Sequence, residues 1–114
     1  MKRYWATMAA NERFGPIRKG LLEFLILKVV AADKVYAADI LKRLSTTQFA
    51  TQEGTLYPLL SKLRRDGLVD YEWRESSAGP PRKYYQLTAS GVEHLAELDA
   101  YWQGIDRTVR EMGK

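Results

Sequence analysis

The spacing of the apolar residues changes twice along this chain, and this change constrains the fold more than any other feature. Apolar side chains recur at helical spacing between residues 17 and 31, and again between residues 36 and 44. From Val69 to Trp73 they alternate with charged residues, as in a strand with one buried face. After Thr88 the helical spacing returns. This order predicts a mainly helical α+β domain that contains one β-hairpin.

A third helix is predicted over residues 51–65, although this segment contains Gly54 and Pro58, which both weaken helices. Its apolar residues at helical spacing are Leu56, Leu59, Leu60 and Leu63. Thr51 is expected as the N-cap, and Gly67 is expected to end the helix. Pro58 has no N–H for the carbonyl group of Gly54, and the glycine leaves the backbone room to shift. Two further explanations of Gly54 stay open: the close approach of a DNA strand, or relief of crowding against the second helix.

The hairpin is predicted from strands at residues 69–74 and 83–87, with a turn-rich loop at residues 76–81. Trp73 is expected on its buried face. Thr88 is expected to cap the final helix, whose apolar residues follow one another at steps close to a heptad repeat. This stripe predicts a dimerisation seam, with packing on its own domain as the alternative. The seam residues are Leu95, Leu98, Trp102, Ile105, Val109 and Met112.

Composition excludes several classes of protein. A chain of 114 residues without cysteine fits one domain, and it has neither a disulfide scaffold nor a thiolate metal site. The longest apolar stretch, residues 21–32, is interrupted by Glu23 and Lys28, so no membrane span is predicted. The first residues lack the apolar run of a signal peptide, and a cytoplasmic protein is expected. One histidine, His94, without a catalytic set or a phosphate-binding glycine loop, predicts no enzyme activity, no cofactor and no metal.

The net charge of +4 suits a nucleic-acid partner and is unevenly distributed. Residues 1–19 carry five basic groups and one acidic group, whereas residues 88–114 carry three basic and five acidic groups. Three helices followed by a hairpin form a winged helix-turn-helix, a three-helix bundle with a two-stranded β-wing, whose third helix enters the major groove. We therefore divide the chain into an N-terminal arm or short helix (1–15), a DNA-binding domain (16–88) and a C-terminal dimerisation helix (89–114). The arm is expected on flanking DNA or on the dimer partner.

Contacts to bases are expected from the N-terminal half of the third helix. There Gln52 can bond adenine in two places, and the methyl group of Thr55 can meet that of thymine. Basic residues along this helix and at the wing are expected on phosphates. Tyr57 is either a phosphate contact or a core aromatic. The full set expected at double-stranded DNA is Tyr36, Lys42, Thr51, Gln52, Gly54, Thr55, Tyr57, Lys62, Arg64, Arg65, Arg82 and Lys83.

The motif residues themselves resemble the signature of PadR-family transcriptional regulators. The match runs through Thr51, Gly54-Thr55-Leu56-Tyr57-Pro58, Leu60, Leu63, Gly67-Leu68-Val69, Arg82-Lys83-Tyr84-Tyr85, Leu87-Thr88 and Gly91. The length resembles the short subfamily with a single C-terminal helix, which implies a homodimer and repression of stress or drug-response genes. Members often have Tyr-Gly-Tyr-Glu where this chain has Tyr36-Ala37-Ala38-Asp39. This departure removes any contact that the second tyrosine would make.

The resemblance also implies a ligand site. Some drug-responsive regulators of this kind sandwich planar aromatic molecules between tryptophans of the last helix. Trp102, with Tyr101 and Leu98, occupies the matching place, and a small aromatic effector is the implied ligand. The alternative is that Trp102 only packs at the dimer seam. The hypothesis is a ligand-responsive repressor that binds a pseudo-palindromic operator as a homodimer. The competing hypothesis is a protein–protein adaptor that uses the fold without specific DNA binding.

Overall fold

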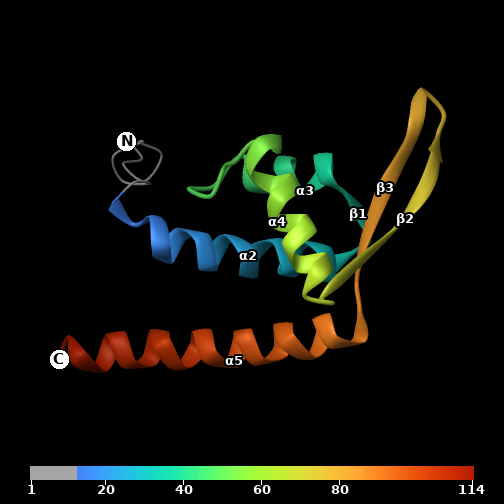
Figure 1. Ribbon diagram of the computed structural model, residues 1–114. Coiled ribbons are helices and arrows are strands. Elements are labelled where there is room, and N and C mark those ends of the chain that lie inside the picture. The colour runs from blue at the N-terminus through green and yellow to red at the C-terminus, as the bar shows by residue number, and fades with distance from the viewer. Residues whose placement is uncertain (1–12) are drawn as a thin grey trace.

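The computed structural model describes residues 13–114 and confirms the mainly helical α+β fold (Figure 1). Its elements in chain order are α2 (Gly15–Ala32), β1 (Val35–Tyr36), α3 (Ala37–Leu44), α4 (Glu53–Arg65), β2 (Val69–Ser76), β3 (Gly79–Leu87) and α5 (Ala89–Met112). The three helices, the hairpin and the long last helix appear in the predicted order. The expectations for the arm at residues 1–12 fall outside the described residues.

One core joins all the helices and the base of the sheet. The apolar stripe of α2 supplies Ile26 and Leu27, which are almost fully buried, and Ile40 of α3 lies in the same cluster. The four leucines of α4 predicted at helical spacing are all buried: Leu56, Leu59, Leu60 and Leu63. These leucines form the inner face of α4, so its outward face carries none of them.

The sheet has three strands rather than the predicted two, in the order β1-β3-β2. Strand β1 has only two residues, which pair antiparallel with Tyr84 and Tyr85 of β3. A strand this short shows no alternation in the sequence, so its pattern could not predict it. The hairpin is also longer than expected, because its turn is confined to residues 77–78. Pro80 and Pro81 lie within β3 beside an irregularity in the register between Arg74 and Ser76, where strands tolerate proline.

Two helix ends confirm the predictions and one corrects them. Gly67 adopts φ 77° after α4, as a C-terminal glycine does. The hydroxyl oxygen of Thr88 accepts the N–H of Gly91 at 2.9 Å and so caps α5. The N-cap of α4 is Gln52 rather than Thr51, and no side-chain bond caps it. The prediction that Thr51 is the N-cap was wrong, because the helix begins one residue later than the capping chemistry indicated.

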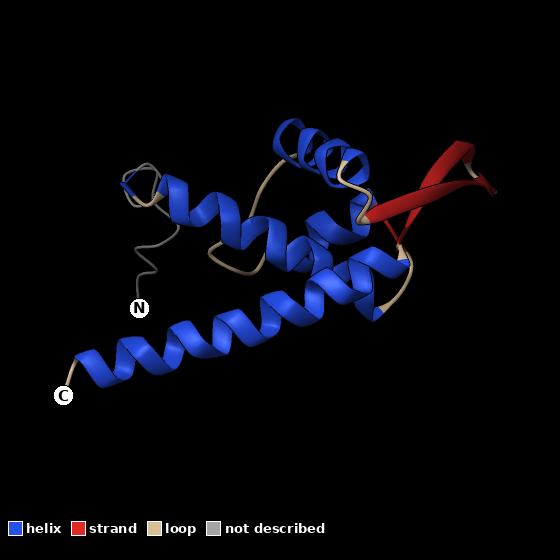
Figure 2. Ribbon diagram, turned by 60° about the horizontal axis from the view of Figure 1, so that its bottom comes forward, coloured by secondary structure: helices blue, strands red, loops and turns tan. Residues whose placement is uncertain are grey.

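Trp73 corrects another expectation. Its side chain is 61% exposed rather than buried in the hairpin. The hairpin projects beyond the helices, so only its base has a layer to pack on (Figure 2). Val69 and Tyr85 at that base are buried in the core, whereas the strand residues farther out are mostly exposed. Alternation predicted which residues share a face of the hairpin but not how far the helices cover that face.

Helix α5 runs alongside α2 in the opposite direction (Figure 1). An ion pair joins Lys28 of α2 to Asp99 of α5 at 2.8 Å. Leu95 is buried in the core and Leu98 packs against it, but the apolar residues farther along α5 are exposed. Within residues 13–114, no helix is both long and apolar enough to cross a membrane.

Candidate nucleic-acid interface

The outward face of α4 carries the residues predicted to meet bases. Gln52, Glu53 and Thr55 are exposed at the N-terminal end of this helix. Tyr57 is 45% exposed, which excludes the core alternative for its ring. Polar and aromatic groups here project from a helix whose leucines anchor it in the core. A helix of 13 residues held this way can present its first turns to a groove of DNA.

Gly54 gives this face a position without a side chain. A Cβ built at Gly54 meets no heavy atom of the described residues within 4 Å. Crowding against α3 therefore does not explain the glycine. Pro58 lies four residues on and leaves the carbonyl group of Gly54 without the helical N–H donor. The backbone at Gly54 is open to the approach of another molecule.

The cations at the far end of α4 differ in their partners. Lys62 pairs with Glu23 of α2 at 3.0 Å and with Asp66 at 3.2 Å. These hydrogen bonds, the one to Glu23 first, raise the pKa of Lys62 above its ordinary value. Arg64 lies 3.4 Å from Asp70 and stacks on the ring of Tyr71, 4.8 Å from its centroid. Lys62 therefore ties α4 to α2, which the sequence could not show because Glu23 is 39 residues away.

Arg65 is exposed like Arg64 but differs from it and from Lys62 in its partners. It forms no ion pair with any residue between 13 and 114. It lines a groove of about 470 Å³ between α2 and α4, together with Gly54, Thr55, Arg18 and Lys19. Gly54 and Thr55 of the groove lining belong to the outward face of α4, so Arg65 shares this groove with residues predicted to contact DNA.

On the other side of α4, the wing holds its cations against aromatic rings. Arg82 lies over Tyr36 at 4.4 Å from the ring centroid, and Lys83 lies over Tyr71 and Trp73 at 4.6 and 5.5 Å. Such contacts orient a cation without neutralising its charge. The sequence predicted that both cations contact DNA, but it did not predict the rings that hold them, because these rings belong to other strands.

Arg74 is a wing residue that the sequence analysis did not single out. It stacks on Tyr84 at 4.3 Å and pairs with Glu72 at 2.7 Å. The hydrogen bond from Arg74 lowers the pKa of Glu72. Its place opposite Arg82 in the register brings two like charges together at this point of the hairpin. The alternation of residues 69–74 was the signal that could have placed it there.

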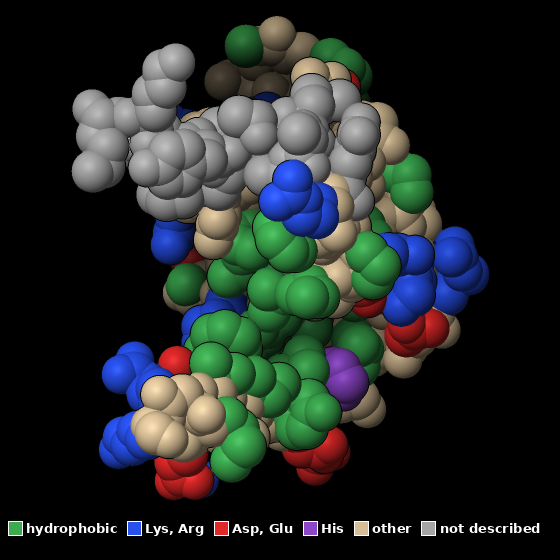
Figure 3. All heavy atoms as spheres, turned by 90° about the vertical axis from the view of Figure 1, so that its left-hand side faces the viewer, with side chains coloured by type: hydrophobic (Ala, Val, Ile, Leu, Met, Phe, Trp, Pro, Cys, Tyr) green, Lys and Arg blue, Asp and Glu red, His purple; other side chains and the backbone are tan. Residues whose placement is uncertain are grey.

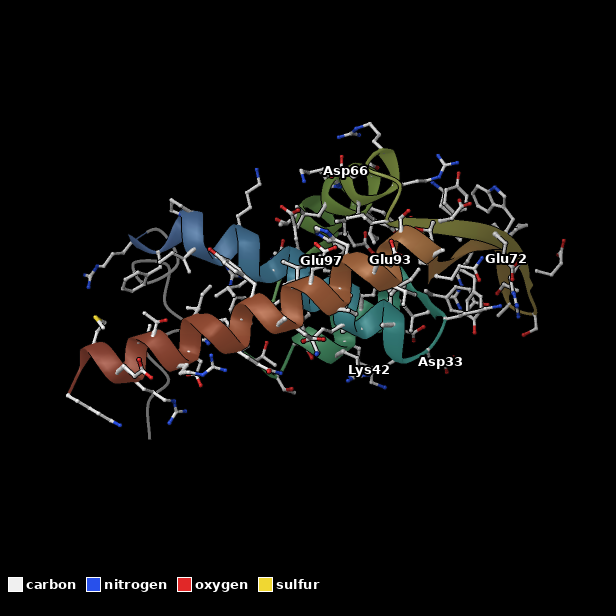
Figure 4. All side chains as sticks on the ribbon, turned by 90° about the horizontal axis from the view of Figure 1, so that it is seen from below. Asp33, Lys42, Asp66, Glu72, Glu93 and Glu97 are labelled. Atoms are coloured by element: carbon white, nitrogen blue, oxygen red, sulfur yellow. The ribbon has the colours of Figure 1, made fainter. Side chains whose placement is uncertain are left out.

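A second groove brings the predicted residues of three elements together. It has a volume of about 360 Å³, and its lining includes Tyr36, Glu53, Tyr57, Arg82 and Lys83. Lys42 is not part of it and lies at the end of α3. Figure 4 shows Lys42 and Asp66 on opposite sides of α5, so Lys42 is also separate from the cations that end α4.

The residues predicted for dimerisation divide into two groups. Leu95 and Leu98 belong to the protein's own core. The other four are exposed on the second half of α5: Trp102, Ile105, Val109 and Met112. Tyr101, predicted for the ligand site, is exposed there too. Figure 3 shows hydrophobic side chains gathered at the end of the molecule where α2 begins and α5 ends. Phe14 and Ile17 of this end are also more than half exposed.

Known proteins resemble this chain over most of its length. The family described as "Transcriptional regulator PadR-like family" matches residues 26–97. A PadR-like transcription factor of Bacteroides fragilis is 44% identical, covers 89% of this chain and 98% of its own, and superposes with a TM-score of 0.77. A PadR-like transcriptional regulator of Bacillus cereus is 35% identical, with coverage of 82% and 92% and a TM-score of 0.75. The transcriptional regulator Rv3488 of Mycobacterium tuberculosis is 36% identical over 72 residues, 63% of this chain and 66% of that protein.

Proposed function

The chain belongs to the PadR-like family of transcriptional regulators, and from this premise we propose that it represses transcription as a ligand-responsive homodimer bound to a two-part operator. The family and the similar proteins are DNA-binding regulators of transcription and not enzymes. Repression, dimerisation and the response to a ligand are the steps that we add. Repression rests on the DNA surface, and dimerisation and the ligand response rest on one apolar face.

The DNA surface is the outward face of α4 together with the wing. The observation that carries it is the groove in which Tyr36, Tyr57, Arg82 and Lys83 gather beside the first turn of α4. Hydroxyl groups and cations in this place suit phosphates, while the exposed side chains of Gln52 and Thr55 suit base edges. Gly54 allows the backbone of α4 to come close to the DNA.

The dimer surface is the exposed apolar face formed by the end of α5 and the start of α2. Trp102 is 44% exposed and Val109 is 65% exposed, although both lie on the apolar stripe of the helix. A contiguous apolar face of this kind is typical of an interaction site. For a two-fold dimer on this face to bind two half-sites, its α4 helices must lie about one helical turn of DNA apart.

The effector site is assigned to the same face. Trp102 and Tyr101 offer flat apolar rings with a polar edge, which suit a planar aromatic molecule between the two copies. Such a molecule weakens operator binding if it binds more tightly to a dimer whose half-site spacing is wrong. The effector thus acts on spacing rather than on the contacts of α4.

Fluorescence anisotropy at physiological salt tests this function. Labelled duplex from upstream of the protein's own gene is compared with a scrambled duplex of the same length. We expect tight binding to the first alone, its loss in Gln52→Ala, and no loss in the control Gln103→Ala on α5. Equal weak binding to both duplexes that vanishes with added salt would overturn the proposal in favour of the adaptor. Planar aromatic compounds are then added to the bound complex, and release is expected only from a protein that retains Trp102.

A further inference from the structure

Arg18 of α2 holds the turn that precedes α4. Its two terminal nitrogens reach across to residues 30 and 32 positions later in the chain. Nη1 donates to the carbonyl oxygen of Gln48 at 2.9 Å, and Nη2 donates to that of Ala50 at 3.1 Å. The guanidinium carbon lies 5.3 Å from the ring centroid of Phe49. One half-buried side chain thus fixes three consecutive residues.

The turn between α3 and α4 has few other ties of its own. Thr47 supplies them, because its hydroxyl oxygen accepts the N–H of Phe49 at 3.0 Å and its carbonyl oxygen accepts the N–H of Ala50 at 3.1 Å. Both of these bonds stay within the turn. Among the described residues, the side-chain hydrogen bonds that link the turn to α2 are those of Arg18. Arg18 therefore ties the turn to α2 by hydrogen bonds, alongside the packing of Phe49 against the core.

The position of this turn is transmitted to the residues that face DNA. Ala50 is followed two residues later by Gln52, the N-cap of α4. The first bonds of the helix run from the N–H groups of Thr55 and Leu56 to the carbonyl oxygen of Gln52 at 3.0 Å. No side chain caps α4, so the incoming backbone and the burial of Leu56 in the core together set the place of its first turn.

We propose that Arg18 is a positioning residue for DNA recognition: it anchors the turn before α4 and so fixes where Gln52 and Thr55 meet the bases. The effect on DNA rests on the proposed function, whereas the anchoring does not. The competing role for Arg18 is a phosphate contact, because it lines the groove beside Gly54 and Thr55. Its two terminal nitrogens are instead directed at backbone carbonyl groups. Lysine cannot replace it, because one ammonium group does not reproduce the fork that bridges two carbonyls.

The test compares Arg18→Ala and Arg18→Lys with the control Lys19→Ala, which removes a neighbouring exposed cation of the same helix. In the full chain without DNA, amide hydrogen exchange of Phe49 and Ala50 is expected to accelerate roughly tenfold in both Arg18 variants, since charged donors to two carbonyls are lost. Lys19→Ala is expected to leave these amides unchanged. Unchanged exchange in both Arg18 variants would overturn the anchoring.

Binding of the two duplexes supplies the second readout. We expect both Arg18 variants to lose roughly tenfold in affinity for the specific duplex, with unchanged affinity for the scrambled duplex and an unchanged salt slope. Three outcomes would make Arg18 a phosphate contact and refute the proposal. They are equal losses of affinity on both duplexes, a salt slope shallower by about 0.9 per protomer in Arg18→Ala, and full rescue of binding by lysine. If the wild-type protein does not discriminate between the duplexes, the proposed function fails, and the exchange data still decide the role of Arg18. If Arg18→Ala does not fold, Arg18→Lys carries both measurements.

Discussion

Gly91→Ala is predicted to loosen the attachment of α5 to the DNA-binding domain. Gly91 is the third residue of α5, and a Cβ there would overlap the carbonyl oxygen of Leu68. That oxygen also accepts the N–H of Thr88 at 3.0 Å. The hydroxyl group of Thr88 in turn donates to the carbonyl oxygen of Gly67 at 2.6 Å. The new methyl group meets backbone rather than a flexible side chain, so α5 itself must move.

The change in the free energy of unfolding is the sum of one stabilising and two destabilising effects. Alanine is favoured over glycine within a helix by roughly 0.5–1 kcal/mol. Overpacking against a backbone atom costs about 1–3 kcal/mol, and the loss of the bond from Thr88 to Leu68 costs about 1 kcal/mol more. The net loss in the free energy of unfolding is therefore about 2 kcal/mol, which corresponds to a lowering of Tm by roughly 8 °C.

Urea denaturation followed by circular dichroism measures this loss, at one protomer concentration because association changes apparent stability. Gly104→Ala is the matched control in the same helix, since a Cβ there meets no described atom within 4 Å. The control is expected to be neutral or slightly more stable. If Gly91→Ala is as stable as Gly104→Ala, then α5 does not pack closely against the backbone of Leu68, and the predicted steric overlap is refuted.

Three further predictions test the other surfaces. Gly54→Ala leaves the free energy of unfolding equal or up to about 1 kcal/mol higher. It weakens specific DNA binding, measured by anisotropy, roughly tenfold because a methyl group then separates α4 from the DNA. Unchanged binding would mean that no DNA strand approaches Gly54. Val109→Glu weakens dimerisation at least roughly 30-fold in analytical ultracentrifugation, since two copies of an apolar contact are lost, whereas Gln103→Glu adds the same charge without this effect; equal effects would remove the apolar stripe from the interface. Lys62→Met costs less than about 1 kcal/mol of stability and leaves the salt slope of DNA binding unchanged. Arg65→Met makes this slope shallower by about 0.9 per protomer. A change of slope in Lys62→Met would contradict the assignment of Lys62 to the ion pair with Glu23.

The parts of the fold that could be predicted from sequence are those set by neighbouring residues. Gly67 ends α4 because glycine adopts positive φ at low cost, and Thr88 caps α5 through a bond to an N–H three residues on. The leucines of α4 lie on one face because the helical period places them there. In each case the cause lies within a few residues of its effect.

The missed features depend on residues far apart in the chain. Thr51 has the right chemistry for an N-cap, but the path of the backbone places Gln52 there. Trp73 alternates like a buried strand residue, yet no helix reaches that part of the hairpin. Lys62 is predicted as a DNA contact, and the sequence could not show that Glu23 of another helix lies 3.0 Å away. A single sequence shows neither the extent of a packing layer nor the partner of a charge.

The partners of the cations also bear on the proposed contacts with DNA. Lys62 and Arg64 have carboxylate partners, and Lys42 lies apart from the grooves beside α4. Arg65, Arg82 and Lys83 then remain as the predicted phosphate contacts whose charge no described carboxylate neutralises. These three residues would give a dimer a salt slope of roughly 5, against about 11 if all six predicted cations met phosphates. On the proposed operator, base contacts from α4 would supply the sequence preference that phosphate contacts do not, and they would be effective only if the first turn of α4 is held in place.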